Sequence, residues 1–188
     1  MRLFYTWLMS SAAIRSFFAC EISPKLRENI AKQQSELKAV LPRSVKWVNP
    51  DNIHLTIKFI GEFNHAHLDK LEGSLTKALT AISPIKIAIK GMGVFPSFLK
   101  PRVIWLGIKA ERSLAQLVQI VNHECAQIGY PREKRPFSAH ITLGRVKSHA
   151  SREDHNLIAD EIKSKASIVV GSQTIESLHF IKSDLTPD

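Results

Sequence analysis

Cysteine is scarce in this chain, which has only Cys20 and Cys125 among 188 residues. Two cysteines provide neither a disulfide framework nor a cysteine-rich zinc site. Cys20 lies in a strand-like stretch and Cys125 on the apolar face of an expected helix, so we predict that both are small core residues. Free thiols are typical of a reducing compartment, and we predict a cytoplasmic protein.

Long apolar runs are also lacking. No stretch reaches the ~20 apolar residues that a membrane-spanning helix needs, so no contact with a membrane is predicted. Residues 1–13 contain Arg2, a short apolar segment and Ser-Ser-Ala-Ala, which gives them a weak similarity to a secretion signal. We interpret them as an extension ahead of the domain, with secretion as the alternative.

Acidic residues are outnumbered, with 17 Asp and Glu against 26 Lys and Arg, and the net charge is +9. This excess favours a polyanionic partner such as nucleic acid, although a generic basic surface is the other interpretation. The hydrophobic content of 44% is ordinary for a globular protein, and no low-complexity linker divides the chain. We therefore expect one domain over residues 14–188.

Hydrophobic periodicity predicts alternating strands and helices. Helices are expected at about 24–40, 67–82 and 111–128 and from the capping box at Ser151 onward, with strands at 14–22, 45–48, 53–61, 85–90, 102–108, 138–145, 167–170 and 174–181. Residues 91–101, with two glycines and two prolines, are expected to form a loop. The continuous apolar run 103–106 predicts a strand covered on both faces.

Two of these strands contain the same pattern. His54-Leu55-Thr56-Ile57 and His140-Ile141-Thr142-Leu143 each place a His and a Thr two residues apart between apolar residues. In a strand, such residues share one face, while the apolar residues take the other. Composition predicts only ~0.3 chance His-x-Thr pairs, so two copies in strand context are specific. His149-Ala150-Ser151 has the same spacing without a strand pattern and is given no role.

The two motifs lie 86 residues apart, and each is followed by a loop and a helix. This weak duplication predicts an α+β fold of two lobes, with mainly antiparallel sheets, helices outside and a cleft between the lobes.

Two histidines on facing strands suit phosphoryl transfer. One imidazole can take a proton from the attacking oxygen while the other gives one to the leaving oxygen. The hydroxyls of Thr56 and Thr142 can donate to the nonbridging oxygens of the phosphate. Arg145 follows Thr142 by three residues and can add a charge-assisted contact, although a surface arginine at a strand end is the alternative.

A metal site is the main competing chemistry, because histidines also bind zinc and iron. Such a site needs a third ligand, and neither motif contains an acidic residue. Asp51 and Glu62 flank the first motif but fit a turn and a strand end. His65 and His67 fall at a helix start and are expected to be solvated. We therefore predict neither a metal nor a cofactor.

The chain resembles the two-histidine phosphoesterase superfamily, and within it the RNA 2′,3′-cyclic phosphodiesterases, also called 2′-5′ RNA ligases. The similarity covers about residues 14–187. The matching segments are Arg15-Ser16-Phe17-Phe18-Ala19, His54-Leu55-Thr56-Ile57-Lys58-Phe59-Ile60-Gly61-Glu62, Pro101-Arg102-Val103-Ile104-Trp105-Leu106-Gly107 and Arg135-Pro136-Phe137-Ser138-Ala139-His140-Ile141-Thr142-Leu143-Gly144-Arg145.

The resemblance implies a bilobal fold and metal-free hydrolysis of a 2′,3′-cyclic phosphate at an RNA end to a 2′-phosphate, together with 2′-5′ ligation in reverse. By position, it implies that His54 and His140 are the acid–base pair and that Thr56, Thr142 and Arg145 bind phosphate. We assign His54 as the proton donor and His140 as the acceptor, an order that the sequence leaves open.

The chain also departs from the family pattern. Compared with that pattern, we expect residues 1–13 to be additional and the final strand that family members have after the last turn to be missing, which predicts an exposed sheet edge. Trp47, Phe59, Phe95 and Phe98 are candidates to stack on a base, with core packing as the alternative for each. Lys58 and Arg102 remain unassigned between cleft charges and solvated residues.

Two other functions remain open. The basic surface suits a non-catalytic RNA-binding module, which would bind RNA in a salt-sensitive way without turnover. A related activity of the superfamily, such as opening of ADP-ribose cyclic phosphate or cleavage of 2′-5′ oligoadenylate, is the third hypothesis. No obligate protein partner is predicted.

Overall fold

The computed structural model describes residues 1–5 and 14–183 of the chain. Its helices are α1 (Pro24–Val40), α2 (Leu68–Leu79), α3 (Arg112–Gln127) and α4 (Arg152–Ser164), with 3-10 turns at Pro50–Asn52 and His65–His67. Its strands are β1 (Arg2–Tyr5), β2 (Ile14–Glu21), β3 (Val45–Trp47), β4 (His54–Phe63), β5 (Ile85–Phe95), β6 (Val103–Ala110), β7 (His140–Val146), β8 (Val169–Ile175) and β9 (Ser177–Lys182).

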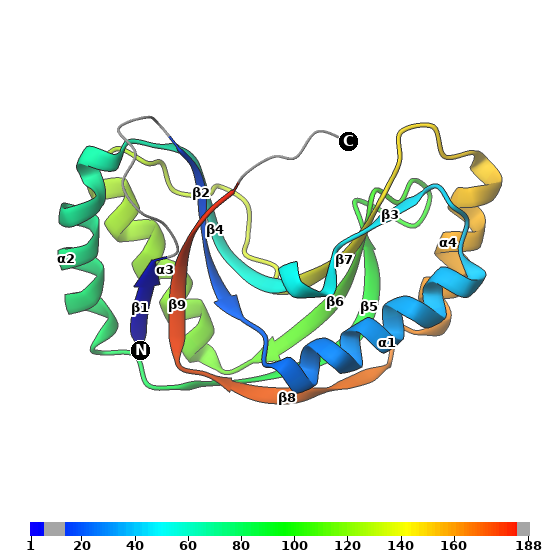
Figure 1. Cartoon of the computed structure of the whole chain (residues 1–188), viewed down its shortest axis with the longest axis horizontal. Coiled ribbons are helices and arrows are strands. Elements are labelled where there is room, and N and C mark those ends of the chain that lie inside the picture. The colour runs from blue at the N-terminus through cyan, green and yellow to red at the C-terminus, as the bar shows by residue number, and fades with distance from the viewer. Residues whose placement is uncertain (6–13, 184–188) are drawn as a thin grey trace.

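The strands form two sheets that meet at an angle, so the molecule is bilobal (Figure 1). The first sheet has the order β1-β9-β2-β4 and the second the order β3-β7-β6-β5-β8. Every described pair is antiparallel except β1 with β9. The predicted α+β fold, with two mainly antiparallel sheets, is confirmed.

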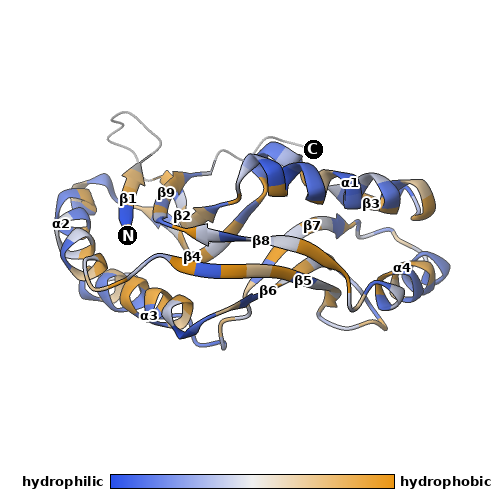
Figure 2. Ribbon diagram, turned by 90° about the horizontal axis from the view of Figure 1, so that it is seen from below, coloured by the Kyte–Doolittle hydropathy of each residue, from blue (hydrophilic) through white to orange (hydrophobic). Residues whose placement is uncertain are grey.

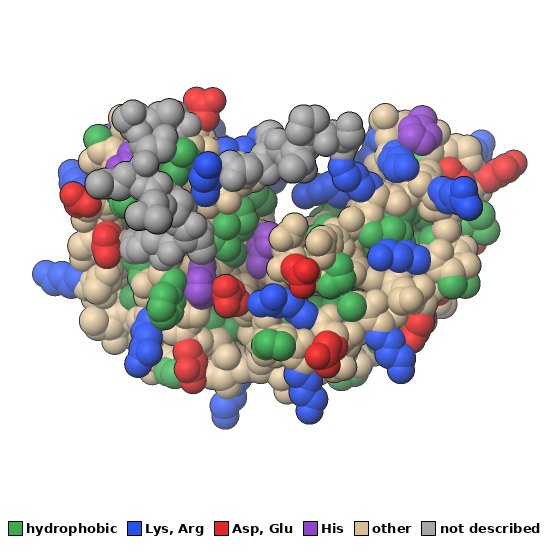
Figure 3. All heavy atoms as spheres, in the orientation of Figure 1, with side chains coloured by type: hydrophobic (Ala, Val, Ile, Leu, Met, Phe, Trp, Pro, Cys, Tyr) green, Lys and Arg blue, Asp and Glu red, His purple; other side chains and the backbone are tan. Residues whose placement is uncertain are grey.

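The helices cover the outer faces of both sheets in pairs. Helices α2 and α3 pack against each other beside the first sheet, while α1 and α4 contact strands of the second sheet. Figure 2 shows the two pairs at opposite ends of the molecule, with their apolar residues turned toward the strands. No α-helix of the described residues therefore covers the inner faces of the sheets, and Figure 3 shows the molecule hollowed between the lobes.

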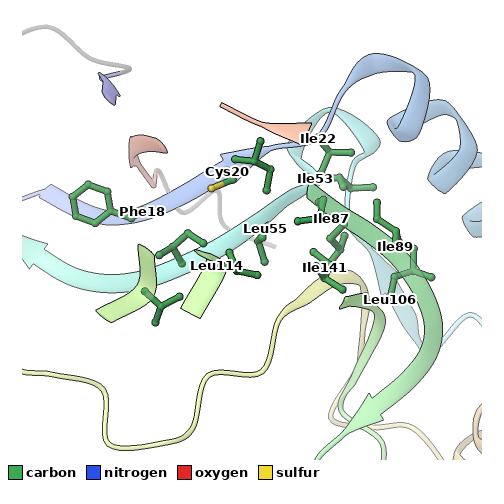
Figure 4. Packing of buried hydrophobic residues seen from close by; sticks show 14 of the residues in the cluster. Phe18, Cys20, Ile22, Ile53, Leu55, Ile87, Ile89, Leu106, Leu114 and Ile141 are labelled. Atoms are coloured by element: carbon green, nitrogen blue, oxygen red, sulfur yellow. The ribbon is translucent and has the colours of Figure 1, made fainter. Parts of the chain in front are cut away.

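One apolar core runs through both lobes. Leu55 of β4, Ile87 of β5 and Ile141 of β7 belong to the same buried cluster, and Figure 4 shows their side chains close together where the sheets meet. Burying a side chain of this size contributes about 1.5–3 kcal/mol. The shared core fixes the angle between the sheets and thereby the position of the strands that carry the two motifs.

Two expectations about the strands were wrong. Strand β5 continues to Phe95, so residues 91–95 are not loop; Gly91, with φ of 80°, lies where the register between β5 and β6 shifts. Residues 103–106 alternate between half-buried and buried instead of being covered on both faces. The half-buried face, with Trp105, belongs to the inner side of the second sheet, which none of the described α-helices covers.

Both cysteines are buried and unpaired, as predicted. Burial raises the pKa of each thiol to about 12, so neither is a reactive thiolate near neutral pH. Ser151 caps α4 through the predicted capping box with Asp154.

The predicted extension, residues 1–13, lies only partly within the described residues. Arg2–Tyr5 form β1 and pair with the outer side of β9, and the amino group of Met1 donates to the carbonyl of Ile82. Strand β9 is therefore not an exposed edge in this structure. The boundary at residue 13 stays a prediction, because residues 6–13 and 184–188 lie outside the described part.

None of the described helices is long and apolar enough to span a membrane. The cytoplasmic location stays a prediction.

Candidate active site

The two motifs meet where β4 and β7 begin. His54 is the first residue of β4 and His140 the first residue of β7, and the two strands contact each other although they belong to different sheets. Figure 1 shows both strands starting near each other, between the lobes, and diverging into opposite lobes. The fold therefore brings together two histidines that are far apart in the sequence.

The predicted alternation is confirmed by burial. Leu55 and Ile57 of β4 are buried, as are Ile141 and Leu143 of β7, while the His and Thr between them are half-buried. Among the described residues, neither Thr56 nor Thr142 has a side-chain hydrogen bond to the protein. Both hydroxyls are available to a ligand.

Both histidines make the same local hydrogen bond. Nδ1 of His54 lies 2.6 Å from the carbonyl oxygen of Asn52, and Nδ1 of His140 lies 2.7 Å from that of Ser138. A carbonyl can only accept, so Nδ1 donates in each case and carries the proton. Nε2 is then the nitrogen that gains or loses a proton, and within the described part of the chain it has no hydrogen-bond partner in either ring.

Each imidazole also rests against a phenylalanine. Phe17 of β2 stacks on His54 with ring centroids 4.8 Å apart, and Phe95 of β5 meets His140 edge-on at 5.0 Å. Burial lowers the pKa of His54, and the hydrogen bond to the Asn52 carbonyl opposes this effect. The sequence patterns assigned no role to Phe17, and they placed Phe95 in a loop.

A bulge follows the motif in both strands. The pairing of β4 with β2 leaves Ile57 as an extra residue, and the pairing of β7 with β6 does the same for Leu143. An extra residue reverses the alternation beyond it, so two consecutive residues face the core. Phe59 and Arg145, each five residues after its His, consequently share the open face with the His and Thr.

These two equivalent positions are chemically different. Phe59 is 63% exposed, and its ring lies 5.7 Å from that of Phe17, which also stacks on His54. Arg145 is exposed and makes no ion pair or hydrogen bond through its side chain with the described residues. The site thus offers, on the β7 side, a cation without a partner in the described part of the chain and, on the β4 side, an aromatic surface.

The sequence left Lys58 unassigned between a cleft charge and a solvated residue, and the structure excludes the solvated interpretation. The bulge turns Lys58 toward α3, where it is 6% exposed. Its ammonium donates to Oδ1 of Asn122 at 3.0 Å and to the carbonyl of Pro131 at 2.7 Å. Lys58 therefore attaches the segment after α3 to β4.

Of the other candidate aromatics, Phe95 contacts His140, whereas Trp47 and Phe98 each lie beside a lysine. Trp47 is half-buried, with Nζ of Lys38 6.0 Å from its ring, and Phe98 is approached by Nζ of Lys163 at 5.5 Å. Trp105 packs beside Phe95, with ring centroids 5.1 Å apart. Phe59 is therefore the best-exposed of the four candidate stacking residues.

The His65 and His67 pair is not part of this site. His67 lies beside the hydroxyl of Tyr130, 3.1 Å from its Nδ1. In the described ranges, no three His, Cys, Asp or Glu side chains are grouped so that they could hold a metal ion.

Comparison with known proteins agrees with this geometry. The model of the LigT-like phosphoesterase family matches residues 21–105 and 106–174, so each matched segment contains one His-x-Thr motif. The chain belongs to the LigT-like phosphoesterase family. The resemblance inferred from the motifs is thereby confirmed.

The curated relatives of this LigT-like phosphoesterase match it over nearly the whole chain. The RNA 2′,3′-cyclic phosphodiesterase of Methanothermobacter thermautotrophicus is 32% identical over 93% of this chain and 92% of its own. The protein of the same name from Archaeoglobus fulgidus is 33% identical over 93% of each.

Solved structures share the fold. A crystal structure of a Thermus thermophilus protein superposes with a TM-score of 0.76 at 24% identity, over 93% of this chain and 91% of the other. The structure of LigT from E. coli complexed with 3′-AMP superposes with a TM-score of 0.70 at 25% identity, over the same shares.

Proposed function

We propose that this LigT-like phosphoesterase hydrolyses 2′,3′-cyclic phosphates at RNA ends to 2′-phosphates. The observation that carries the proposal is the matched pair of imidazoles, His54 and His140, with the same tautomer at the start of two contacting strands. The names of the curated relatives support the same activity. RNA is then the substrate, and the net charge of +9 suits this polyanion.

In the proposed reaction, His140 is the base and His54 the acid. Nε2 of His140 takes a proton from water as the water oxygen bonds to phosphorus. The bond from phosphorus to O3′ breaks, and Nε2 of His54 gives its proton to O3′. In each ring Nδ1 keeps its proton and donates it to the backbone carbonyl throughout, so only Nε2 changes its protonation state. No step in this scheme calls for a metal ion.

The remaining roles follow from the open face. Thr56 and Thr142 donate to the nonbridging oxygens, and the Arg145 guanidinium stabilises their charge. Phe59 provides a stacking surface for the base of the terminal nucleotide. Phe17 and Phe95 position the two rings through contact without touching the substrate.

The asymmetry of the site supports the order of acid and base. In-line displacement places the attacking water opposite O3′, and O3′ belongs to the nucleoside. The nucleoside therefore lies on the side of the acid. Phe59 lies on that side if His54 is the acid, and Arg145 then lies on the side of the base.

The lowered pKa of His54 requires that the assigned acid gain its proton when substrate binds. Burial favours the neutral ring in the free protein, whereas the acid must be protonated. The negative charge of a bound phosphodiester favours the imidazolium and restores the proton in the complex. Binding of substrate and protonation of His54 are then coupled.

Ligation uses the same groups. If the 5′-hydroxyl of a second RNA replaces water, His140 takes its proton and His54 again protonates O3′. The product is a 2′-5′ phosphodiester, and no nucleotide triphosphate is consumed because the cyclic phosphate already carries the strain of a five-membered ring. This reaction is part of the proposal.

A product analysis tests the activity. The protein is incubated with adenosine 2′,3′-cyclic phosphate in the presence of a chelator, and the 2′- and 3′-phosphates are separated by chromatography. We expect the 2′-phosphate only, formed at least about 100-fold more slowly by His54→Ala or His140→Ala. A 3′-phosphate product, or turnover that neither substitution slows, would contradict the proposal.

A further inference from the structure

A second hollow adjoins the candidate active site on the β4 side. It has a volume of ≈ 410 Å³ and is bounded by residues 58–60 of β4 and by residues 130–135, which connect α3 to β7. This volume falls in the range of about 300–1,000 Å³ that is usual for small-molecule sites. Figure 1 shows the connection from α3 running down toward the start of β7, near β4.

The lining is strongly basic. Arg132, Lys134 and Arg135 are exposed cations within four consecutive residues, and Glu133 is the single acidic residue of the lining. Phe59 belongs to the same lining, so the hollow begins where the stacking surface of the active site ends. Cations beside an exposed ring are the combination that binds single-stranded nucleic acid.

Hydrogen bonds hold the backbone of the basic segment, residues 131–135, in place. The buried Lys58 donates to the carbonyl of Pro131, and Oδ1 of Asn122 accepts from both Lys58 and the backbone of Glu133. The side chain of Glu133 in turn accepts from the backbone of Arg135 at 3.2 Å. These hydrogen bonds fix the backbone that carries the side chains of Arg132, Lys134 and Arg135.

We propose that this hollow, bounded by residues 58–60 and 130–135, binds the RNA nucleotide that precedes the one bearing the cyclic phosphate. The inference rests on the proposed function. If His54 protonates O3′, the terminal nucleoside lies over Phe59, and its 5′-phosphate points away from the reacting phosphorus. The preceding nucleotide of the RNA then lies among Arg132, Lys134 and Arg135.

This arrangement selects for a chain over a mononucleotide. A cyclic mononucleotide fills the site between the histidines and Phe59 but leaves the basic hollow empty. An oligonucleotide adds one or two phosphates to the cations, and each such contact contributes a salt-dependence of ~0.7 in the logarithmic slope for single strands. We expect a single strand, because recognition by a ring needs an unpaired base.

The test compares two substrates and two matched variants. Adenosine 2′,3′-cyclic phosphate and a pentanucleotide with a 2′,3′-cyclic phosphate end are assayed with the parent, with R132A/K134A and with K70A/K77A. Lys70 and Lys77 are exposed on α2, outside both sites, so this control removes the same charge.

We expect the parent to prefer the pentanucleotide, with kcat/KM at least about tenfold above that for the mononucleotide. In R132A/K134A, kcat/KM should fall for the pentanucleotide but not for the mononucleotide, so the preference is lost. The slope of the logarithm of pentanucleotide affinity against the logarithm of salt concentration should become shallower by about 1.4, the value for two phosphate contacts. K70A/K77A should behave as the parent.

Three results would overturn the inference: no length preference in the parent, an equal loss for both substrates in R132A/K134A, or the same effect in K70A/K77A. If the parent turns over neither substrate, the proposed function fails instead. The hollow is then tested by fluorescence anisotropy with a 3′-phosphorylated pentanucleotide. Weaker binding in R132A/K134A alone supports the inference, and unchanged binding overturns it.

Discussion

Strands β4 and β7 are two copies of one local design with different endings. In each, a His begins the strand and donates through Nδ1 to a carbonyl two residues earlier, and a Thr follows on the same face. Each then has a bulge at the third residue after the His. This shared part provides the symmetric pair of imidazoles that the proposed in-line reaction uses.

The difference begins at the two residues after the bulge. Strand β4 continues with Lys58 and Phe59, and β7 with Gly144 and Arg145. Lys58 is buried and holds the segment after α3, whereas a Cβ on Gly144 would lie 2.9 Å from Cγ1 of Val45. In the proposed reaction, two similar strands thus have different roles: β4 faces the nucleoside and β7 faces the phosphate.

The largest effect is expected from removing either histidine of the symmetric pair. His54→Ala and His140→Ala should each lower kcat on a cyclic nucleotide by about 100- to 10,000-fold, because each removes one proton transfer. Turnover is measured by chromatography, with folding checked by circular dichroism. His149→Ala is the matched control, since His149 is exposed and lies outside both strands. A loss below tenfold in either strand variant would show that the pair is not the acid–base pair.

The next largest effects are expected from Arg145 and Phe59, the residues in which the two strands differ. Arg145→Ala should weaken competitive inhibition by inorganic phosphate by ~10- to 100-fold, because a charge-assisted contact is lost. Phe59→Ala should leave phosphate inhibition unchanged but raise the KM for a cyclic nucleotide by ~5- to 100-fold. Arg145→Lys should restore part of the phosphate affinity. Equal effects of the two alanine variants on phosphate would contradict the division of roles.

The threonines should be equivalent. Thr56→Val and Thr142→Val keep the shape and remove one donor, and a neutral hydrogen bond is worth about 0.5–1.5 kcal/mol, or ~2- to 12-fold in kcat/KM. Steady-state kinetics with a cyclic nucleotide measure the loss, and Thr76→Val on the exposed side of α2 is the control. An effect in one strand variant alone would mean that only one hydroxyl reaches the phosphate.

The smallest effect concerns the environment of the rings. Burial lowers the pKa of His54, so its titration by NMR should have a midpoint below the ordinary value of ~6.5. Phe17→Leu exposes the ring, which should raise this pKa and move one limb of the kcat/KM profile to higher pH. Phe95→Leu, the matched change beside His140, should leave the His54 midpoint in place. A midpoint at or above 6.5 in the parent would contradict the role of burial.

Much of the site was predictable from local pattern. The His-x-Thr alternation predicted which face each side chain takes, because the period of two in a strand is a property of the backbone. The four helices were likewise predicted close to their observed bounds, since a stripe of apolar residues at helical spacing has one way to be buried. The family resemblance added roles that no spacing contains.

The bulges were not predicted. Strict alternation would put Lys58 beside His54 and Thr56 and would turn Arg145 away from His140. The sequence carries little sign of a bulge. In β4 and β7 alike, an apolar residue precedes the residue that turns inward, and neither Ile57-Lys58 nor Leu143-Gly144 has a residue type that indicates an insertion. A bulge arises from the pairing of two strands, and the register of that pairing is not written in either strand alone.

The sequence by itself determined two strands, each with an imidazole and a hydroxyl on one face, a basic net charge and the α+β order of the elements. Only the tertiary structure decided that the two strands start side by side, that Phe17 and Phe95 pack against the rings, and that Lys58 is buried under a basic segment. Local pattern sets which way a side chain points from its own backbone. Which other side chains it meets depends on how the two sheets share one core, and that is settled by contacts between residues far apart in the chain.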